Sequence, residues 1–98
     1  MLFTLMHSPF QCDLTALIRT VTPGDDILLL QDGVIAGIAG IADTAALALL
    51  LALPVSVSAL RDDIEARGLS GQISSRIAQI DYTDFVNLTV KQRNQVAW

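Results

Sequence analysis

The sequence predicts an α/β fold, with a mostly parallel sheet of about four strands and helices on both of its faces. Short apolar runs of strand length alternate with stretches of helical spacing, and strands joined by helical crossovers produce this alternation. The run from Ile27 to Leu30 is apolar without interruption, which is typical of a central parallel strand buried on both faces. The length of 98 residues suits a single domain, 1–98, with one core.

The first part of the chain contains two predicted strands with a helix between them. Leu2 to Met6 is a short apolar run that ends at the turn formers His7-Ser8-Pro9, as a first strand would. Asp13 is placed to cap a helix that ends at Pro23-Gly24. Ile27 to Leu30 is the second strand. The apolar positions of the helix recur at helical spacing: Leu14, Leu17, Ile18 and Val21.

The middle of the chain is rich in small and apolar residues. Gln31-Asp32-Gly33 ends the second strand, and Val34 to Ala42 predicts either a short helix or a loop loosened by glycine. Asp43 or Thr44 then caps a helix from Ala45 to Leu53, whose alanine and leucine content has high helix propensity. The proline that follows stops this helix.

Two further strands and a charged helix follow. Val55 to Ala59 is predicted as the third strand. Arg61 to Arg67 has the composition of a helix, and Gly68 stands where a left-handed C-terminal cap is needed. Arg76 to Ile80 is predicted as the fourth strand.

The chain closes with a helix and an aromatic residue. Asp81 or Thr83 can cap the closing helix, with Asp84 in its first turn. Chain ends fray unless something holds them, but the large apolar surface of Trp98 gains from burial. We expect Trp98 to pack on its own domain, with a neighbouring subunit as the alternative.

The composition predicts that part of the surface is apolar and is covered either by a membrane or by a partner protein. Charged residues make up 16% of the chain and apolar residues 52%, whereas a typical soluble domain has about 25% charged residues. The apolar run from Val34 to Leu60 is long enough to span a membrane. Glycines, Pro54 and Asp43 interrupt it, so we interpret it as a buried helix followed by a buried strand. A partner protein is therefore the expected cover, and no membrane is expected.

Charge and cysteine content narrow the function further. The net charge is −4, which disfavours direct nucleic-acid binding because such binding depends on Lys and Arg neutralising phosphates. Cys12 is the single cysteine, so no internal disulfide can form. The first charged residue is Asp13, and no cationic leader opens the chain. These features predict a cytoplasmic protein.

The polar residues gather in the loops that follow the predicted strands. In an open α/β sheet, ligands bind at the carboxyl ends of the strands. The loops there hold the single His and the single Tyr, and they supply candidates for a functional rim or a subunit interface, to which the terminal tryptophan is added: His7, Gln31, Asp32, Asp81, Tyr82 and Trp98.

Catalytic, metal and cofactor sites find little support. His7 could act as a base or a metal ligand, but there is no second His, and a loop imidazole with local hydrogen bonds is the favoured interpretation. Cys12 is the one possible nucleophile; a helix start would lower its pKa and Asp13 would raise it. No phosphate-binding glycine motif occurs. We expect no cofactor and no metal.

Two pairs of acidic residues need a separate interpretation. Asp25-Asp26 and Asp62-Asp63 could bind a divalent cation or act as acid and base. Both pairs lie at a predicted turn or first helical turn, so we interpret them as backbone caps or solvated surface. Asp32-Gly33 is interpreted as a turn.

Almost the whole chain resembles one family. The likeness is weakest from Ala36 to Leu53, and the segment from Ile80 onward is its most specific part. The matching stretches are Met1-Leu2, Thr4-Leu5, Ser8-Pro9, Leu28 to Val34, Ala66 to Leu69, Gly71 to Ser74, Ile80 to Val86, Leu88 to Lys91 and Ala97-Trp98. On these residues the chain resembles the TusB family, also described as DsrH-like, which implies the Rossmann-like three-layer fold of DsrE, DsrF and DsrH.

The resemblance implies a role in sulfur relay. TusB-like chains assemble with TusC-like and TusD-like subunits into a heterohexamer with two copies of each. The complex passes persulfide sulfur from TusA to TusE for 2-thiolation of the tRNA wobble uridine.

The same resemblance implies a noncatalytic subunit of a sulfurtransferase complex. The sulfur-accepting cysteine of the complex belongs to TusD, and the comparable loop here, Ala59 to Asp62, has no thiol. Some DsrH relatives carry a cysteine near the first helix, where this chain has the aliphatic Leu17 and Ile18. A persulfide carrier that uses Cys12 is the alternative, and a small enzyme acting alone is a weaker third hypothesis.

Overall fold

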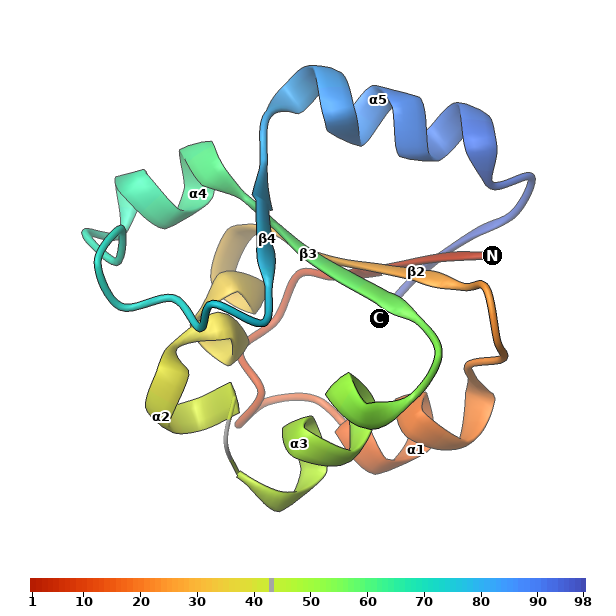
Figure 1. Ribbon diagram of the computed structural model, residues 1–98, viewed down its shortest axis with the longest axis horizontal. Coiled ribbons are helices and arrows are strands. Elements are labelled where there is room, and N and C mark those ends of the chain that lie inside the picture. The colour runs from red at the N-terminus through yellow and green to blue at the C-terminus, as the bar shows by residue number, and fades with distance from the viewer. Residues whose placement is uncertain (43) are drawn as a thin grey trace.

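A parallel sheet organises the computed structural model, which describes residues 1–42 and 44–98 (Figure 1). In these ranges the sheet has five strands in the order β4-β3-β2-β1-β5, all parallel. The predicted α/β class is confirmed, and β2 is the central strand. The strands are β1 (Leu2–Leu5), β2 (Asp26–Leu29), β3 (Ser56–Leu60), β4 (Ala78–Ile80) and β5 (Gln95–Ala97).

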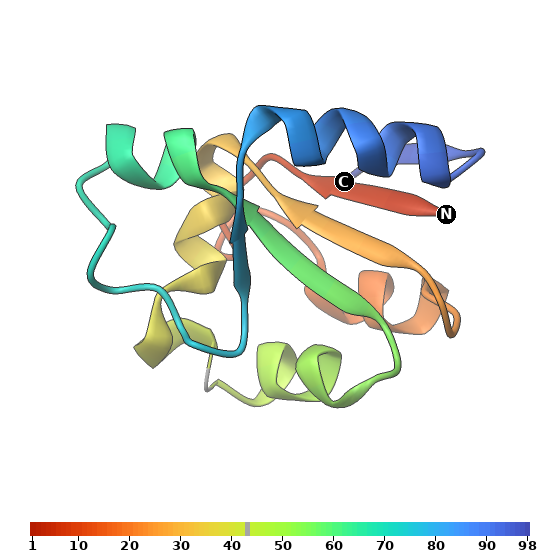
Figure 2. The same ribbon diagram turned by 45° about the horizontal axis from the view of Figure 1, so that its top comes forward.

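Helices cover both faces of this sheet. They are α1 (Leu14–Thr20), the 3-10 helix η1 (Gln31–Gly37), α2 (Ala39–Ala42), α3 (Ala45–Ala52), α4 (Arg61–Ala66) and α5 (Tyr82–Lys91). In both views α1, α2 and α3 lie on one side of the sheet, and α4 and α5 lie on the other (Figures 1 and 2). Among the described residues, none of the helices has the length and apolar character needed to cross a membrane.

The alternation of side chains along the strands divides the core between these two faces. Phe3, Leu5, Ile27 and Leu29 belong to the larger cluster, on the side of α1 and α3. The residues between them point the other way, as successive strand residues do. That second cluster contains Leu2, Leu28, Leu30 and Leu60, with Phe85 and Leu88 of α5 packed against it. Every residue of β2 is buried, so the prediction of a central strand is confirmed.

The fifth strand is a feature that the sequence pattern did not predict. β5 pairs with β1 in parallel, with Phe3 opposite Val96 and Thr4 opposite Ala97. Just beyond it, Trp98 packs on its own domain, as expected. The backbone N–H of Trp98 donates to the Thr4 carbonyl at 2.7 Å, and the rings of Phe3 and Trp98 meet edge to face with centroids 6.2 Å apart. The C-terminal segment is therefore an edge of the sheet.

Several element boundaries differ from the predicted ones. The third strand runs from Ser56 to Leu60 rather than from Val55 to Ala59. The fourth strand begins at Ala78, not Arg76, because the Ile77 N–H donates to the Ser74 carbonyl in a turn.

The alternatives left open for Val34 to Ala42 are resolved in favour of helix. This stretch completes η1 and then forms α2. Thr44 stands at the N-cap of α3 without a side-chain capping bond. Asp43, the other predicted cap, lies outside the described residues. The helix ends at Ala52, one residue earlier than predicted.

The predicted caps of the other helices are largely confirmed. Asp13 accepts a hydrogen bond from the Ala16 N–H at 3.0 Å at the start of α1. Asp81, rather than Thr83, caps α5, and it forms a reciprocal capping box with Asp84. Gly68 adopts a left-handed conformation with φ of +68° after α4, where a side chain would be strained.

Candidate functional site

The loops at the carboxyl ends of β2 and β3 are tied together by charged side chains. The Gln31 N–H donates to Asp63 Oδ2 at 2.6 Å. Arg67, just after α4, donates from Nε and Nη2 to Asp32 Oδ1 at 3.1 and 3.0 Å. Gln31 has a positive φ of 52°, a conformation that costs free energy for a residue with a Cβ. The bond to Asp63 holds this turn in place.

A second link joins the end of β3 to β4. Arg61 Nη2 donates to the Gln79 carbonyl at 3.1 Å. The hydrogen bond from the Asp84 N–H is the main cause that lowers the pKa of Asp81, and the charge of Arg61 contributes. We call the polar residues that follow β2, β3 and β4 at this end of the sheet the carboxyl rim: Gln31, Asp32, Arg61, Asp63, Arg67 and Asp81. Arg67 bonds to Asp32, Asp63 bonds to the Gln31 backbone and Arg61 bonds to the Gln79 carbonyl, so these side chains stabilise the loops.

The other candidates do not join this rim. His7 is exposed in the loop after β1, and none of the described hydrogen bonds or ion pairs connects its side chain to the carboxyl rim. Tyr82 is 63% exposed on α5, and its ring meets Phe85 edge to face. Trp98 is half-buried, with Nε1 donating to the Asp13 carbonyl at 3.0 Å. Of the six candidates, the structure brings Gln31, Asp32 and Asp81 to the rim.

Cys12 lies in the connection between β1 and α1. Its thiol is free and half-buried, and the side chain packs against the larger core cluster. Burial, and then the charge of Asp13, raise the pKa of the thiol. Because the thiolate is the nucleophile in sulfur chemistry, this environment makes Cys12 less reactive near neutral pH.

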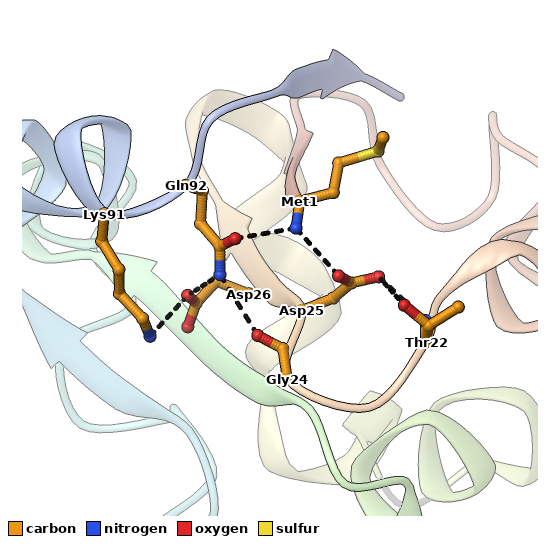
Figure 3. Close-up of polar contacts among 7 residues, drawn as sticks. All are labelled: Met1, Thr22, Gly24, Asp25, Asp26, Lys91 and Gln92. Carbon is orange, nitrogen blue, oxygen red and sulfur yellow. Dashed lines mark hydrogen bonds and ion pairs between the residues drawn. The ribbon is translucent and has the colours of Figure 1, made fainter.

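Asp25 and Asp26 are not the solvated pair that the sequence suggested. Both are buried, with 6% and 3% of their surface exposed. Asp25 Oδ1 accepts from the Met1 ammonium at 2.9 Å, and its Oδ2 accepts from the Thr22 N–H at 2.8 Å (Figure 3). Burial alone would raise the pKa of this carboxyl, but these hydrogen bonds outweigh burial and lower it. Only the capping part of the interpretation, toward Thr22, is confirmed.

Asp26 completes this buried network at the amino end of the sheet. Its Oδ2 accepts from Lys91 Nζ at 2.9 Å and from Gln92 Nε2 at 2.7 Å (Figure 3). These partners lie 65 and 66 positions further along the chain, so no local pattern could have revealed them. The network fastens the end of α5 to the start of β2.

The other acidic pair is confirmed as part of a first helical turn. Asp62 and Asp63 both lie in the first turn of α4. Asp62 is exposed, while Asp63 binds the backbone of the neighbouring loop at Gln31. In the described part of the chain, no three His, Cys, Asp or Glu side chains are grouped to hold a metal ion.

A groove runs between α5 and the β3–β4 edge of the sheet. Its volume is about 520 Å³. Ile80 and Leu88 give it an apolar floor beside polar groups of α5. Its lining is Ser58, Ile80, Asp84, Asn87, Leu88 and Lys91. Lys91 is paired with Asp26 and Asp84 belongs to the capping box, so both charged groups of the lining already stabilise the fold.

Comparison of the sequence with known proteins shows the family to which the chain belongs. The family described as DsrH like protein matches residues 7–95. The chain belongs to the DsrH-like family. Similar full-length members are each named Protein TusB, from Serratia proteamaculans (57% identical), Cronobacter sakazakii (56%) and Erwinia tasmaniensis (52%). Each match covers 100% of this chain and 100% of the relative.

Solved structures extend the comparison to the fold. The ychN protein from E. coli has a TM-score of 0.78 at 16% identity, and the match covers 99% of this chain and 97% of that one. Protein Tm0979 from Thermotoga maritima has a TM-score of 0.66 at 25% identity, covering 96% and 97%. The DsrH-like chain thus shares its α/β architecture with these proteins.

Proposed function

We propose that this chain is a noncatalytic structural subunit of a TusBCD-type sulfur-relay complex. In this proposal it assembles in the cytoplasm with TusC-like and TusD-like subunits, two copies of each. The complex supports persulfide transfer from TusA to TusE for 2-thiolation of the tRNA wobble uridine. The chain itself contributes binding surface rather than a sulfur-accepting thiol.

The environment of Cys12 is the observation that carries this proposal. A sulfur-accepting cysteine needs a lowered pKa and access to its donor. Cys12 instead has its pKa raised by burial and by Asp13, and it packs against the core. The segment where β3 passes into α4, from Ala59 to Asp62, contains no cysteine, although the carboxyl end of a strand is the usual place for chemistry in this architecture.

The surface supports a role in assembly. Large apolar side chains are exposed on several elements, and subunits of permanent complexes cover such surface with their partners. The most exposed of them are Phe10, Leu49, Tyr82, Val86 and Val90.

The decisive experiment replaces Cys12 in the assembled complex. The chain, as wild type or as Cys12→Ser, is co-expressed with its TusC-like and TusD-like neighbours in cells that lack it. Wobble 2-thiouridine is measured by mass spectrometry of digested tRNA. We expect Cys12→Ser to keep the complex and its thiolation at the wild-type level, because the thiol takes no part in transfer.

The contrary result would favour the persulfide-carrier alternative. Normal assembly with lost thiolation in Cys12→Ser would assign the sulfur to Cys12. A control variant separates assembly from sulfur transfer. Replacement of the sulfur-accepting cysteine of the TusD-like partner by serine should abolish thiolation while the complex stays intact.

A further inference from the structure

The α-amino group of Met1 belongs to the polar network at the amino end of the sheet. Its ammonium donates to Asp25 Oδ1 at 2.9 Å and to Gln92 Oε1 at 2.7 Å (Figure 3). These acceptors lie 24 and 91 positions away along the chain. The terminal amine therefore joins the start of β2 to the segment that follows α5, as the side chain of a buried network would.

The sheet holds the backbone of Met1 next to this network. The Met1 carbonyl accepts from the Asp26 N–H at 3.1 Å, and the Leu2 N–H donates to the Asn94 carbonyl at 2.9 Å. The Leu2 side chain is fully buried in the second core cluster. Because the peptide group between Met1 and Leu2 is bonded on both sides, the amine stays within reach of its two acceptors.

Both acceptors depend on this amine. Asp25 is buried, and in the described part of the chain the Met1 ammonium is the one cation that pairs with it. A buried carboxylate that loses its cation is strongly destabilising. The amide of Gln92 has a fixed orientation, because Nε2 already donates to Asp26 Oδ2 at 2.7 Å and to the Gly24 carbonyl at 3.2 Å. Its oxygen is therefore directed at Met1.

We infer that the α-amino group of Met1 is a structural group that must stay unacylated for the fold to be fully stable. An acyl group turns the ammonium into a neutral amide with a single N–H. Asp25 then loses its counter-charge, and one of the two acceptors loses its donor. This inference stands on the contacts of Met1, independently of any role in sulfur relay.

The inference makes removal of an N-terminal formyl group a step in the maturation of the fold. Bacterial chains begin with formylmethionine when they are made, and the formyl group neutralises the amine. Its hydrolysis consumes one water and breaks the C–N bond between the formyl carbon and the Met1 nitrogen. Formate leaves, and the proton that formic acid gives up goes to the freed amine. The resulting ammonium is the group that binds Asp25 and Gln92.

Peptide ligation at Cys12 supplies modified full-length chains without a change of sequence. A synthetic segment 1–11 is joined to a recombinant segment 12–98 through the Cys12 thiol, and the product is refolded. The first segment is made with a free, an N-formyl or an N-methyl Met1. N-methylation keeps the positive charge and two N–H donors, enough for Asp25 and Gln92, so it is the matched control for added bulk. Urea unfolding followed by circular dichroism measures each chain.

We expect the N-formyl chain to have an unfolding equilibrium constant about tenfold larger than that of the free chain, since it lacks about one hydrogen bond of a charged group. The N-methyl chain should stay within about threefold of the free chain. Asp25→Asn, introduced in segment 12–98, should reduce the effect of the formyl group to less than about threefold, because the ammonium then has no carboxylate to pair with.

Three results would overturn the inference. The N-formyl and free chains could unfold at the same urea concentration, in which case the amine does not stabilise the fold. The N-methyl chain could lose as much stability as the N-formyl chain, which would assign the loss to bulk. The formyl effect could also persist in Asp25→Asn. A loss confined to the N-formyl chain and dependent on Asp25 supports the inference, and so does an N-formyl chain that fails to fold where the N-methyl chain folds.

Discussion

Gly33 lies where the first turn of η1 meets the end of β1. A Cβ atom there would lie 1.8 Å from the Leu5 carbonyl oxygen, a backbone atom that cannot move aside. The Leu5 carbonyl also accepts a hydrogen bond from the Leu30 N–H at 3.0 Å. The turn after β2 can therefore approach β1 only because residue 33 has no side chain.

Replacement of Gly33 tests this close approach. We expect Gly33→Ala to destabilise the fold by about 3 kcal/mol, since the new methyl group must displace backbone. Gly40→Ala is the matched control, because a Cβ at Gly40 meets nothing within 4 Å. The control should stay within about 1 kcal/mol of wild type. Urea unfolding followed by circular dichroism measures both, and equal midpoints would refute the steric explanation.

The buried carboxylate of Asp25 makes stability depend on pH. Its hydrogen bonds lower its pKa in the folded state, below the value near 3.9 of an unfolded aspartate. The unfolded chain then binds more protons between these two pKa values, so stability rises with pH there. This contribution is complete above the unfolded pKa and is lost as the pH falls through the folded one.

Removing the charge of Asp25 should remove that pH dependence. We expect Asp25→Asn to lower the free energy of unfolding by about 2 kcal/mol at neutral pH, which is the usual contribution of buried hydrogen bonds to a charged group. Its unfolding free energy should also fall less between pH 5 and pH 2 than that of wild type. Asp62→Asn, at an exposed position, should change stability by less than about 0.5 kcal/mol. A parallel pH profile for wild type and Asp25→Asn would contradict the assignment.

At the scale of elements, β5 joins the two ends of the chain. It pairs with β1, and Trp98 then reaches back to α1 through the Asp13 carbonyl. Three residues would not form a stable strand alone. The strand exists because Val96 and Trp98 pack against the larger cluster and because β1 offers a free edge.

A series at Trp98 separates ring packing from the hydrogen bond. Trp98→Phe keeps an aromatic ring but loses the bond from Nε1, at an expected cost of about 1 kcal/mol. Trp98→Ala also loses the contact with Phe3 and should cost about 3 kcal/mol. Thermal unfolding of the full chain measures both. If Trp98→Ala unfolds at the wild-type temperature, the terminal strand does not stabilise the domain.

At the scale of the whole molecule, the apolar surface is spread over separate elements. Phe10 precedes α1, and Leu49 belongs to α3. The exposed Tyr82, Val86 and Val90 belong to α5, on the opposite side of the sheet. One small partner cannot cover surfaces on both sides of a domain. The proposed assembly with two kinds of sister subunit accounts for this distribution.

Co-expression tests the whole-molecule proposal. We expect the chain alone to give a low soluble yield and to bind a hydrophobic dye such as ANS. Together with its TusC-like and TusD-like neighbours it should elute as one larger species with little dye binding. Leu49→Glu should weaken this assembly if α3 lies in an interface, whereas Glu65→Gln, at an exposed position of α4, serves as a control. A monomer that is soluble, binds no dye and ignores its neighbours would contradict the proposal.

Local signals predicted much of the fold but only part of the rim. The caps at Asp13 and Asp81 were predictable because their partners lie three residues away. The links from Arg67 to Asp32 and from Asp63 to Gln31 span 35 and 32 positions. The sequence predicted which loops meet, through the rule that parallel strands end at one edge. It could not predict that their charges would bond to one another.

The sequence by itself determined the α/β class, the central place of β2, the helix caps at Asp13 and Asp81, and the membership of the DsrH-like family. These properties depend on apolar periodicity, on neighbours within one helical turn and on residues shared with relatives. Only the tertiary structure decided the fifth strand, the burial of Asp25 and Asp26, and the environment of Cys12. Each depends on groups that are far apart in the chain and meet only when the sheet forms, because burial and pairing are properties of the folded state.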